Sequence, residues 1–388
     1  MRIGAGISSE HDALHGASEA ARSAAAGLDG AAPDIAVVFA SGAHLVTPEA
    51  TLEAVHAELS PQSLVGCGAG GVLGCGRELE SGTAVTVWAA ALQGGSADVF
   101  HATVTEEQED EPGVLEGLPE PGVDDTLVIL PDPYSFPTDA VLAGLARDAP
   151  GVPVLGGLSS GRTLQGTGAL FLDHEVREQG AVGFCLRGVD VLACVSQGAA
   201  PLGREMTITA AEGNVIQELA GRPALQTIEE VIGELELAER TLVAAGLLVG
   251  IVIDSGKPDY EQGDFLVRGV LGADPDTGAV AIGAHVEPGQ ILRLHARNAA
   301  LAADDLGREL AMRAHVPSAN EVAGALVFSC NGRGQAMFGA CDHDAKLVGN
   351  VLGAPAAGFF AAGEIGPVGA RSFLHAFTAT VAVFADTS

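Results

Sequence analysis

The chain has 388 residues, of which 47% are hydrophobic and 18% charged, and its formal net charge is −31. This length and composition predict a globular protein of two or three domains and exclude a disordered chain. Because 19 basic residues stand against 50 acidic ones, no large basic surface is available, which excludes nucleic acids and anionic membranes as expected partners.

No apolar run approaches the ~18 residues that a membrane-spanning helix needs. The N-terminus also lacks a basic segment followed by an apolar core, so we expect a cytoplasmic protein. The six cysteines include no C-x-x-C pair, which argues against a disulfide framework and against a zinc ribbon. We expect neither a metal nor a cofactor.

The N-terminal part of the chain predicts a strand at residues 2–7 and an Ala-rich helix at 13–26 that begins near Asp12. A unit of alternating strands and a helix follows. Its predicted elements are strand 35–40, helix 48–59, a short strand ending at Gly66, a Gly-rich turn and strand 83–92.

Two later stretches repeat this pattern. The second unit has strand 126–130, helix 138–147, strand 153–156 and strand 181–186, and the third begins at strand 326–328. The spacing from strand to glycine is similar in all three: 29 positions for Val37–Gly66, 29 for Leu127–Gly156 and 32 for Leu326–Gly358. Single helices between strands at this distance predict parallel pairing, with equivalent loops at equivalent places. Chance similarity among α/β units is the alternative.

In residues 189–320 the order of predicted strands and helices differs from that of the repeat units, which predicts an inserted α+β subdomain. Strands are expected at 192–197, 206–210, 247–253, 265–271 and 279–284, and helices at 214–219, 225–237 and 298–312. The acidic stretch 106–125 predicts a surface linker. Together these elements predict an α/β fold of repeated strand–helix–strand units in largely parallel or mixed sheets. Two domains are expected, residues 1–188 and 189–388, with the third unit at 321–388.

Two glycine-rich segments match common motifs but lack the context that those motifs require. Residues 66–71 satisfy G-x-G-x-x-G, yet the Gly-rich residues after them do not predict the helix of a dinucleotide site. Residues 157–161 satisfy G-x-S-x-G, yet a nucleophile elbow leads into a helix and residues 162–168 are a poor one. We interpret the first as a turn, and Ser159 as a turn serine or a hydrogen-bond donor to a ligand.

Cys330 directly follows a predicted strand and could form a thiolate–imidazole pair with His343 or His375. No third residue that would orient the imidazole is evident. Asp342, His343 and Asp344 are adjacent, so they cannot all face one metal ion. A helix N-cap by either aspartate is the simpler interpretation.

The segment after strand 326–328 reads Ser-Cys-Asn-Gly-Arg-Gly, and Gly-Phe-Phe-Ala-Ala-Gly-Glu-Ile-Gly-Pro follows at 358–367. These motifs closely resemble the C-terminal half of FIST-domain proteins, and residues 195–216 resemble the opening of that half. Val-Gly-Cys-Gly at 65–68 is similar to the N-terminal FIST stretch, with Gly68 in place of the expected hydroxyl residue. The resemblance covers nearly the whole chain. It implies a sensory protein of intracellular signal transduction that binds a small molecule, such as an amino acid or similar zwitterion.

Arg333 and Glu364 are the main candidates for ligand binding, because both lie in Gly-rich loops after strands of the third unit. A guanidinium recognises a carboxylate, a carboxylate receives an ammonium, and Asn331 adds a donor and an acceptor. The alternative is a salt bridge between Arg333 and Glu364 that braces the loops. Equivalent loop positions and cysteines at strand ends complete the predicted ligand-binding set: Ser41, Cys67, Asp132, Ser159, Ser160, Arg162 and Cys330.

Two other functions are compatible with the same residues. Cys330 or Ser159 could serve as the nucleophile of a hydrolase or transferase, because catalytic residues also gather at the ends of parallel strands. A protein-binding scaffold is the third possibility, since eukaryotic FIST relatives occur in ubiquitin-ligase subunits. The expected partners are a small-molecule ligand and, as a further candidate, a signalling protein.

Overall fold

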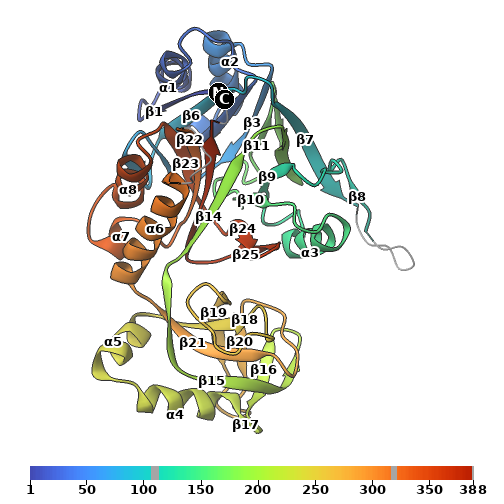
Figure 1. Cartoon of the computed structure of the whole chain (residues 1–388), viewed down its shortest axis with the longest axis vertical. Coiled ribbons are helices and arrows are strands. Elements are labelled where there is room, and N and C mark those ends of the chain that lie inside the picture. The colour runs from blue at the N-terminus through green and yellow to red at the C-terminus, as the bar shows by residue number, and fades with distance from the viewer. Residues whose placement is uncertain (106–112, 316–320, 387–388) are drawn as a thin grey trace. The chain divides into compact units, whose positions relative to one another are not determined.

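The computed structural model describes residues 1–105, 113–315 and 321–386, and the chain folds as two compact units of mixed α/β structure (Figure 1). The larger unit contains Met1–Val195, Leu306–Leu374 and Ala379–Ser388. The smaller unit contains Ser196–Asp305 and His375–Thr378, so it is inserted within the C-terminal half of the chain. Among the described residues, no helix combines the length and the apolar composition needed to span a bilayer.

Three mixed sheets make up most of the larger unit, and each contains one parallel pair of strands with a helical crossover between them. This arrangement confirms the predicted strand–helix–strand units. The elements are β2 (Ile35–Ser41), α2 (Pro48–Leu59) and β3 (Ser63–Gly68); β9 (Thr126–Pro131), α3 (Thr138–Asp148) and β10 (Val154–Gly157); and β22 (Val322–Cys330), α8 (His343–Leu352) and β23 (Ala356–Ala361).

Antiparallel strands extend each sheet on the side of the first strand of the pair, two of them at equivalent places in all three sheets. These strands are β6 (Ala84–Ala91) and β1 (Arg2–Ser8) in the first sheet, β13 (Ala181–Arg187) and β7 (Ser96–Val104) in the second, and β26 (Thr378–Ala385) and β14 (Val191–Gln197) in the third.

On the other side, each sheet is extended by a hairpin that belongs to a different one of the three strand–helix–strand repeat units. The first sheet takes β11 (Leu170–Leu172) and β12 (Glu175–Arg177), the second takes β24 (Glu364–Val368) and β25 (Arg371–His375), and the third takes β4 (Val72–Gly74) and β5 (Arg77–Leu79). Every unit therefore gives its hairpin to the sheet of another unit, in a cyclic exchange.

Three glycines show that the repeat extends to backbone packing. Gly66, Gly156 and Gly358 each lie opposite the neighbouring parallel strand. A Cβ atom at these positions would lie 1.9, 1.9 and 1.8 Å from the carbonyl oxygens of Val38, Ile129 and Val327. Only glycine allows this close approach of two backbones.

The three sheets share one apolar core. Phe39 of β2 stacks on Phe359 of β23 with ring centroids 4.7 Å apart, and Phe328 of β22 meets both rings edge to face. Trp88 packs against Phe384 at a centroid distance of 4.8 Å. Side chains of the second sheet, including Val128, Leu130 and Leu155, belong to the same core. The inner faces of all three sheets are thus buried together.

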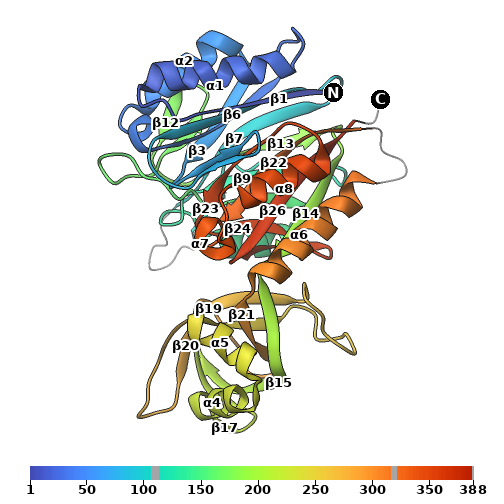
Figure 2. The same cartoon turned by 90° about the vertical axis from the view of Figure 1, so that its left-hand side faces the viewer.

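Helices cover the outer faces of the first and third sheets (Figures 1 and 2). Asp12 caps α1 (Ala13–Gly27), which packs beside α2, and α6 (Ala299–Ala314) lies beside α8. The short helices η1 (Gly42–Leu45) and α7 (Gln335–Phe338) follow β2 and β22. Of the predicted linker, residues 106–112 lie outside the described residues, and β8 (Leu115–Glu116) forms within 113–125.

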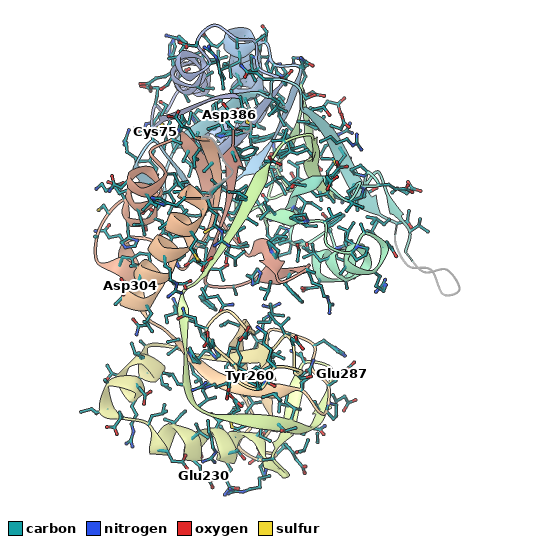
Figure 3. The ribbon with its side chains drawn as sticks, in the orientation of Figure 1. Cys75, Glu230, Tyr260, Glu287, Asp304 and Asp386 are labelled. Atoms are coloured by element: carbon teal, nitrogen blue, oxygen red, sulfur yellow. The ribbon has the colours of Figure 1, made fainter. Side chains whose placement is uncertain are left out.

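The smaller unit is an antiparallel barrel, closed by the pairing of β15 with β16. Figure 3 labels Tyr260 within this unit and Glu230 on its helix α4. Its elements are β15 (Ala199–Glu212), β16 (Val215–Leu219), β17 (Arg222–Pro223), α4 (Ala224–Glu234), α5 (Leu237–Ala245), β18 (Leu247–Val252), β19 (Phe265–Ala273), β20 (Val280–Ile282) and β21 (Ile291–Arg297).

The prediction of a helix at 214–219 is wrong, because this segment is β16. Ile216 and Leu219 are three positions apart, which suits one face of a helix, but both are buried in the barrel core instead. Pairing with β15 and β20 satisfies the backbone of this segment. Tertiary pairing therefore overrides the local pattern.

Candidate functional site

Polar side chains occupy the carboxyl ends of the parallel strands. Ser41, Asp132 and Cys330 are equivalent, because each lies three positions after the residue that faces one of the paired glycines. In α/β sheets this edge is the usual place for ligands. The three residues nevertheless lie in three different sheets, so the predicted set divides into separate local groups.

Ser41 is held by the backbone of its own sheet. Its Oγ donates to the carbonyl oxygens of Gly82 and Ala84, at 3.0 and 3.3 Å, and the side chain is buried. These contacts fasten the end of β2 to the start of β6. Ser41 therefore presents no hydroxyl to solvent.

Ser159 and Ser160 join loops from different units. Ser159 Oγ donates to the Gly68 carbonyl at 2.8 Å. Ser160 Oγ accepts from the Gly70 amide at 2.9 Å and donates to the Phe360 carbonyl. The residues directly after Ser159, up to β11, form no helix, so the strand-to-helix turn of a nucleophile elbow is not formed there.

Cys67 lies beside this junction and is fully enclosed. Burial raises the pKa of its thiol well above the ordinary range, and a hydrogen bond with Ser159 offsets that effect only in part. The side chain behaves as a small buried hydrophobe. By contrast, Cys75, labelled in Figure 3, lies at the exposed turn between β4 and β5.

Asp132 and Arg162 meet at the carboxyl ends of β9 and β10. Arg162 Nη2 donates to Asp132 Oδ1 at 3.0 Å, and the side chains are 32% and 4% exposed. The other carboxylate oxygen, Oδ2, accepts from Ser135 Oγ at 2.8 Å and from the Tyr134 amide at 3.2 Å. The Arg162 guanidinium lies 4.1 Å from the centre of the Tyr134 ring. Asp132 is thus fixed by three donors, whereas Arg162 reaches solvent.

This pair borders a polar pocket of about 280 Å³. Its other walls come from the loop after β10 and from the end of β12: Gly166, Thr167, Gly168, Glu178 and Gln179. Asp132 and Arg162 were predicted from the sequence as ligand-binding residues, whereas Tyr134 and Ser135 were not. The signal was available, because both residues lie within three positions of Asp132 in the loop that leads to α3.

Arg333 forms a buried ion pair with Asp344. Its Nε and Nη2 donate to the two Asp344 carboxylate oxygens at 2.6 and 3.0 Å, and Ser329 Oγ adds a bond of 3.0 Å. Burial opposes ionisation of Asp344, but the Arg333 charge prevails and lowers the pKa of the carboxyl. The sequence prediction named Glu364 as the partner of Arg333 and did not consider Asp344.

The expected N-cap of α8 is also corrected in part. Asp342 occupies the N-cap position, but its carboxylate accepts the Glu78 amide at 2.8 Å and makes no capping bond. Asp344 lies in the first turn, where His343 Nδ1 approaches it at 2.9 Å. The His343 ring also stacks on Phe338, with centroids 3.6 Å apart.

The remaining predicted residues surround this ion pair. Glu364 is 0% exposed. Burial lowers the pKa of Arg333, but the charge and hydrogen bond of Asp344, with a smaller contribution from Glu364, raise it overall. Cys330 is buried, and its sulfur accepts the Gly332 amide at 3.4 Å. Asn331 is exposed, and its backbone N–H donates to the carbonyl oxygen of Ala361. The group fastens β22, α8 and β23 together.

Comparisons with known proteins agree with this architecture. The FIST N domain model matches residues 34–222, and the FIST C domain model matches residues 224–367. Uncharacterized proteins MT0656 and Rv0628c, from Mycobacterium tuberculosis strains CDC 1551 and H37Rv, are each 42% identical over 388 residues, covering all of both chains. Uncharacterized protein Mb0898c of Mycobacterium bovis is also 42% identical, over all of this chain and 99% of its own length. The chain belongs to the FIST family, whose domains are sensory domains of signal-transduction proteins.

Proposed function

We propose that the chain is a cytoplasmic sensory protein that binds a small zwitterion, such as an amino acid, in the pocket bordered by Asp132 and Arg162. One observation carries this proposal. A carboxylate and a guanidinium lie 3.0 Å apart beside a polar pocket of about 280 Å³, at the carboxyl ends of two parallel strands. Both charge types that a zwitterion requires are therefore present at one place.

The two side chains are suited to different parts of the ligand. Asp132 is fixed by Ser135 and by the Tyr134 amide, so it can receive an ammonium group without reorganisation. Arg162 is partly exposed and can turn its guanidinium fork toward a carboxylate. A bound zwitterion would replace the single Asp132–Arg162 contact with two charge-assisted contacts. The small pocket volume favours a compact ligand.

Arg333 and Glu364 have a supporting role in this proposal. They are 2% and 0% exposed, and two nitrogens of Arg333 already bind Asp344. A ligand could reach them only after the loops had opened. Their burial supports a structural function for the third unit, while the second unit binds the ligand and a signalling protein receives the output.

The test is native mass spectrometry of the purified protein, followed by thermal unfolding with each amino acid and with small carboxylates. We expect a bound mass or a ligand-dependent rise in Tm. Asp132→Asn and Arg162→Gln should abolish the rise, whereas Arg177→Gln, at a partly exposed arginine of β12 that pairs with Glu175, should leave it intact. A ligand whose effect survives both pocket substitutions binds elsewhere. Absence of any response across the panel would overturn the zwitterion proposal.

A further inference from the structure

Two of the three sheets carry a second helix at the same place in the repeat. In the first unit, α1 follows β1 and precedes β2, and it packs beside α2. In the third unit, α6 follows β14, after the inserted barrel, and precedes β22, and it packs beside α8. Figures 1 and 2 show both helix pairs lying side by side.

The second unit differs at this place. Its strand β7 ends at Val104 and β9 begins at Thr126, and in the described part of the intervening chain, residues 113–125, there is β8 but no helix. From this segment, Leu118 packs on the outer face of the second sheet. Therefore α3 has no helical neighbour within the part of the chain that the structure describes.

A groove of about 810 Å³ lies along α3 in place of that neighbour. Its walls include Val104, Leu115, Leu118, Pro137, Gly144 and Leu145. The contrast with α2 is direct. Ala54 and Val55 lie twelve and eleven positions before Gly66 and are 3% and 0% exposed under α1. Gly144 and Leu145 lie at the same distances before Gly156, but they remain partly exposed at the groove.

We propose that this groove binds an amphipathic helix of a partner protein, with small apolar residues on its buried face and basic residues on its flanks. The helical shape follows from α1 and α6, which fill the equivalent places. The small residues follow from α1, whose buried positions are Gly16, Ala17, Ala20, Ala21 and Ala24. This surface is distinct from the ligand pocket and does not depend on the zwitterion.

Charge argues for a basic partner and against a second copy of the chain. Glu120 and Asp148 border the groove with Arg147 as the one basic residue among its described walls. The chain as a whole carries a net charge of −31, so two copies would repel each other. A basic helix would instead be attracted, and its binding should weaken as salt increases.

The probe is a stapled helical peptide of the length of α1, with alanines on one face and arginines on the other. Its binding to the full chain is measured by fluorescence anisotropy and by hydrogen exchange of residues 138–149. Gly144→Trp fills the groove, and among the described residues, apart from the backbone of α3, the new Cβ meets only the tip of Arg147 within 4 Å. Ala143→Trp is the matched control, because Ala143 is exposed on α3 but does not line the groove. Ala140→Trp is a second blocking variant.

We expect the peptide to bind and to protect α3 from exchange. Affinity should fall at least about tenfold in Gly144→Trp and Ala140→Trp but not in Ala143→Trp. A peptide with glutamates in place of arginines should bind about tenfold more weakly. Absence of binding up to about 1 mM peptide would overturn the proposal, as would binding that both blocking variants leave unchanged. Self-association that Gly144→Trp disrupts would assign the groove to a second copy instead.

Discussion

Arg333 and Asp344 form a bidentate ion pair in which both side chains are buried, with 0% and 1% of their side-chain surfaces exposed. The pair connects the loop after β22 to the first turn of α8. Arg333 Nη1 has no hydrogen-bond acceptor among the described residues, and Ser329 supplies a third donor to Asp344. The arrangement has the geometry of a brace between two elements of one repeat.

Removing one member of this pair should be costly. Arg333→Ala or Asp344→Ala leaves an uncompensated buried charge, so we expect each to lower the free energy of unfolding by about 3–5 kcal/mol. The double variant Arg333→Met/Asp344→Leu should recover much of that loss. Glu175→Ala, in an exposed pair with Arg177, should change stability by less than about 1 kcal/mol. Urea unfolding of the four variants provides the measurement, and single variants as mild as the control would contradict the brace.

The paired glycines should not tolerate a methyl group. Gly358→Ala would place Cβ 1.8 Å from the Val327 carbonyl oxygen, so β22 and β23 would have to separate. We expect a loss of about 3 kcal/mol or more, at the upper end for overpacking. In α8, a Cβ at Gly349 meets no described atom within 4 Å outside the backbone of that helix, so Gly349→Ala should be neutral or stabilising by up to about 1 kcal/mol. Equal unfolding midpoints for these two variants would refute the close approach.

Glu78 should make the larger unit less stable as pH rises. Burial raises the pKa of this carboxyl above its ordinary value of 4.5, assisted by the charges of Asp344 and Glu80, although the Ala345 amide donates to it. The folded state therefore holds its proton at pH values where the unfolded state has lost it, and stability falls as pH rises through that window. Glu78→Gln keeps an acceptor and removes the titration.

The measurement is the stability difference between Glu78→Gln and the native chain from about pH 4 to pH 8. We expect the difference to grow in favour of the variant as pH rises. Glu49→Gln, in the exposed first turn of α2, serves as the control for removing one acidic charge. A difference that stays constant across the range would show that Glu78 does not titrate in this way.

His295 in the barrel should stay neutral at pH values well below those at which histidine side chains usually take up a proton. Burial lowers its pKa to about 4, and its Nδ1 is bonded to the Arg293 carbonyl at 3.1 Å. Since the unfolded chain takes up a proton near pH 6.5 and the folded barrel does not, stability should fall between about pH 6.5 and 4. The histidine ring signal in an NMR titration, assigned with His295→Asn, checks the value. A midpoint near 6.5 would contradict it.

The elements that were predicted correctly are those that depend on the pattern and spacing of residues close together in the sequence. The spacing from each strand to its glycine predicted three parallel pairs, because a crossover of one helix has a narrow range of lengths. Asp132 and Arg162 could be placed together for the same reason, since they follow the two strands of one pair. The loops that carry them are short enough for strand order to fix their position.

The features that escaped prediction depend on partners distant in sequence. β4 pairs with β23 although more than half of the chain separates them. Arg333 has several carboxylates within its own unit, among them Asp344 and Glu364, and only the three-dimensional positions distinguish them. No local periodicity carries that information. The β16 segment was misread because a spacing of three suits a helix as well as an irregular barrel strand.

The exchange of hairpins determines the order in which the sheets of the nascent chain can be completed during synthesis. One edge of β3 stays unpaired until Leu170–Leu172 has been synthesised, and one edge of β10 stays unpaired until Glu364–Val368 has been synthesised. The β4–β5 hairpin, made early, has no sheet to join until Ala356–Ala361 has emerged. Unpaired strand edges can pair with other chains, and the edges of β4 and β10 stay exposed until residues 356–368 have been synthesised. We expect a stop codon anywhere before Ala361 to yield aggregates rather than a shorter folded protein.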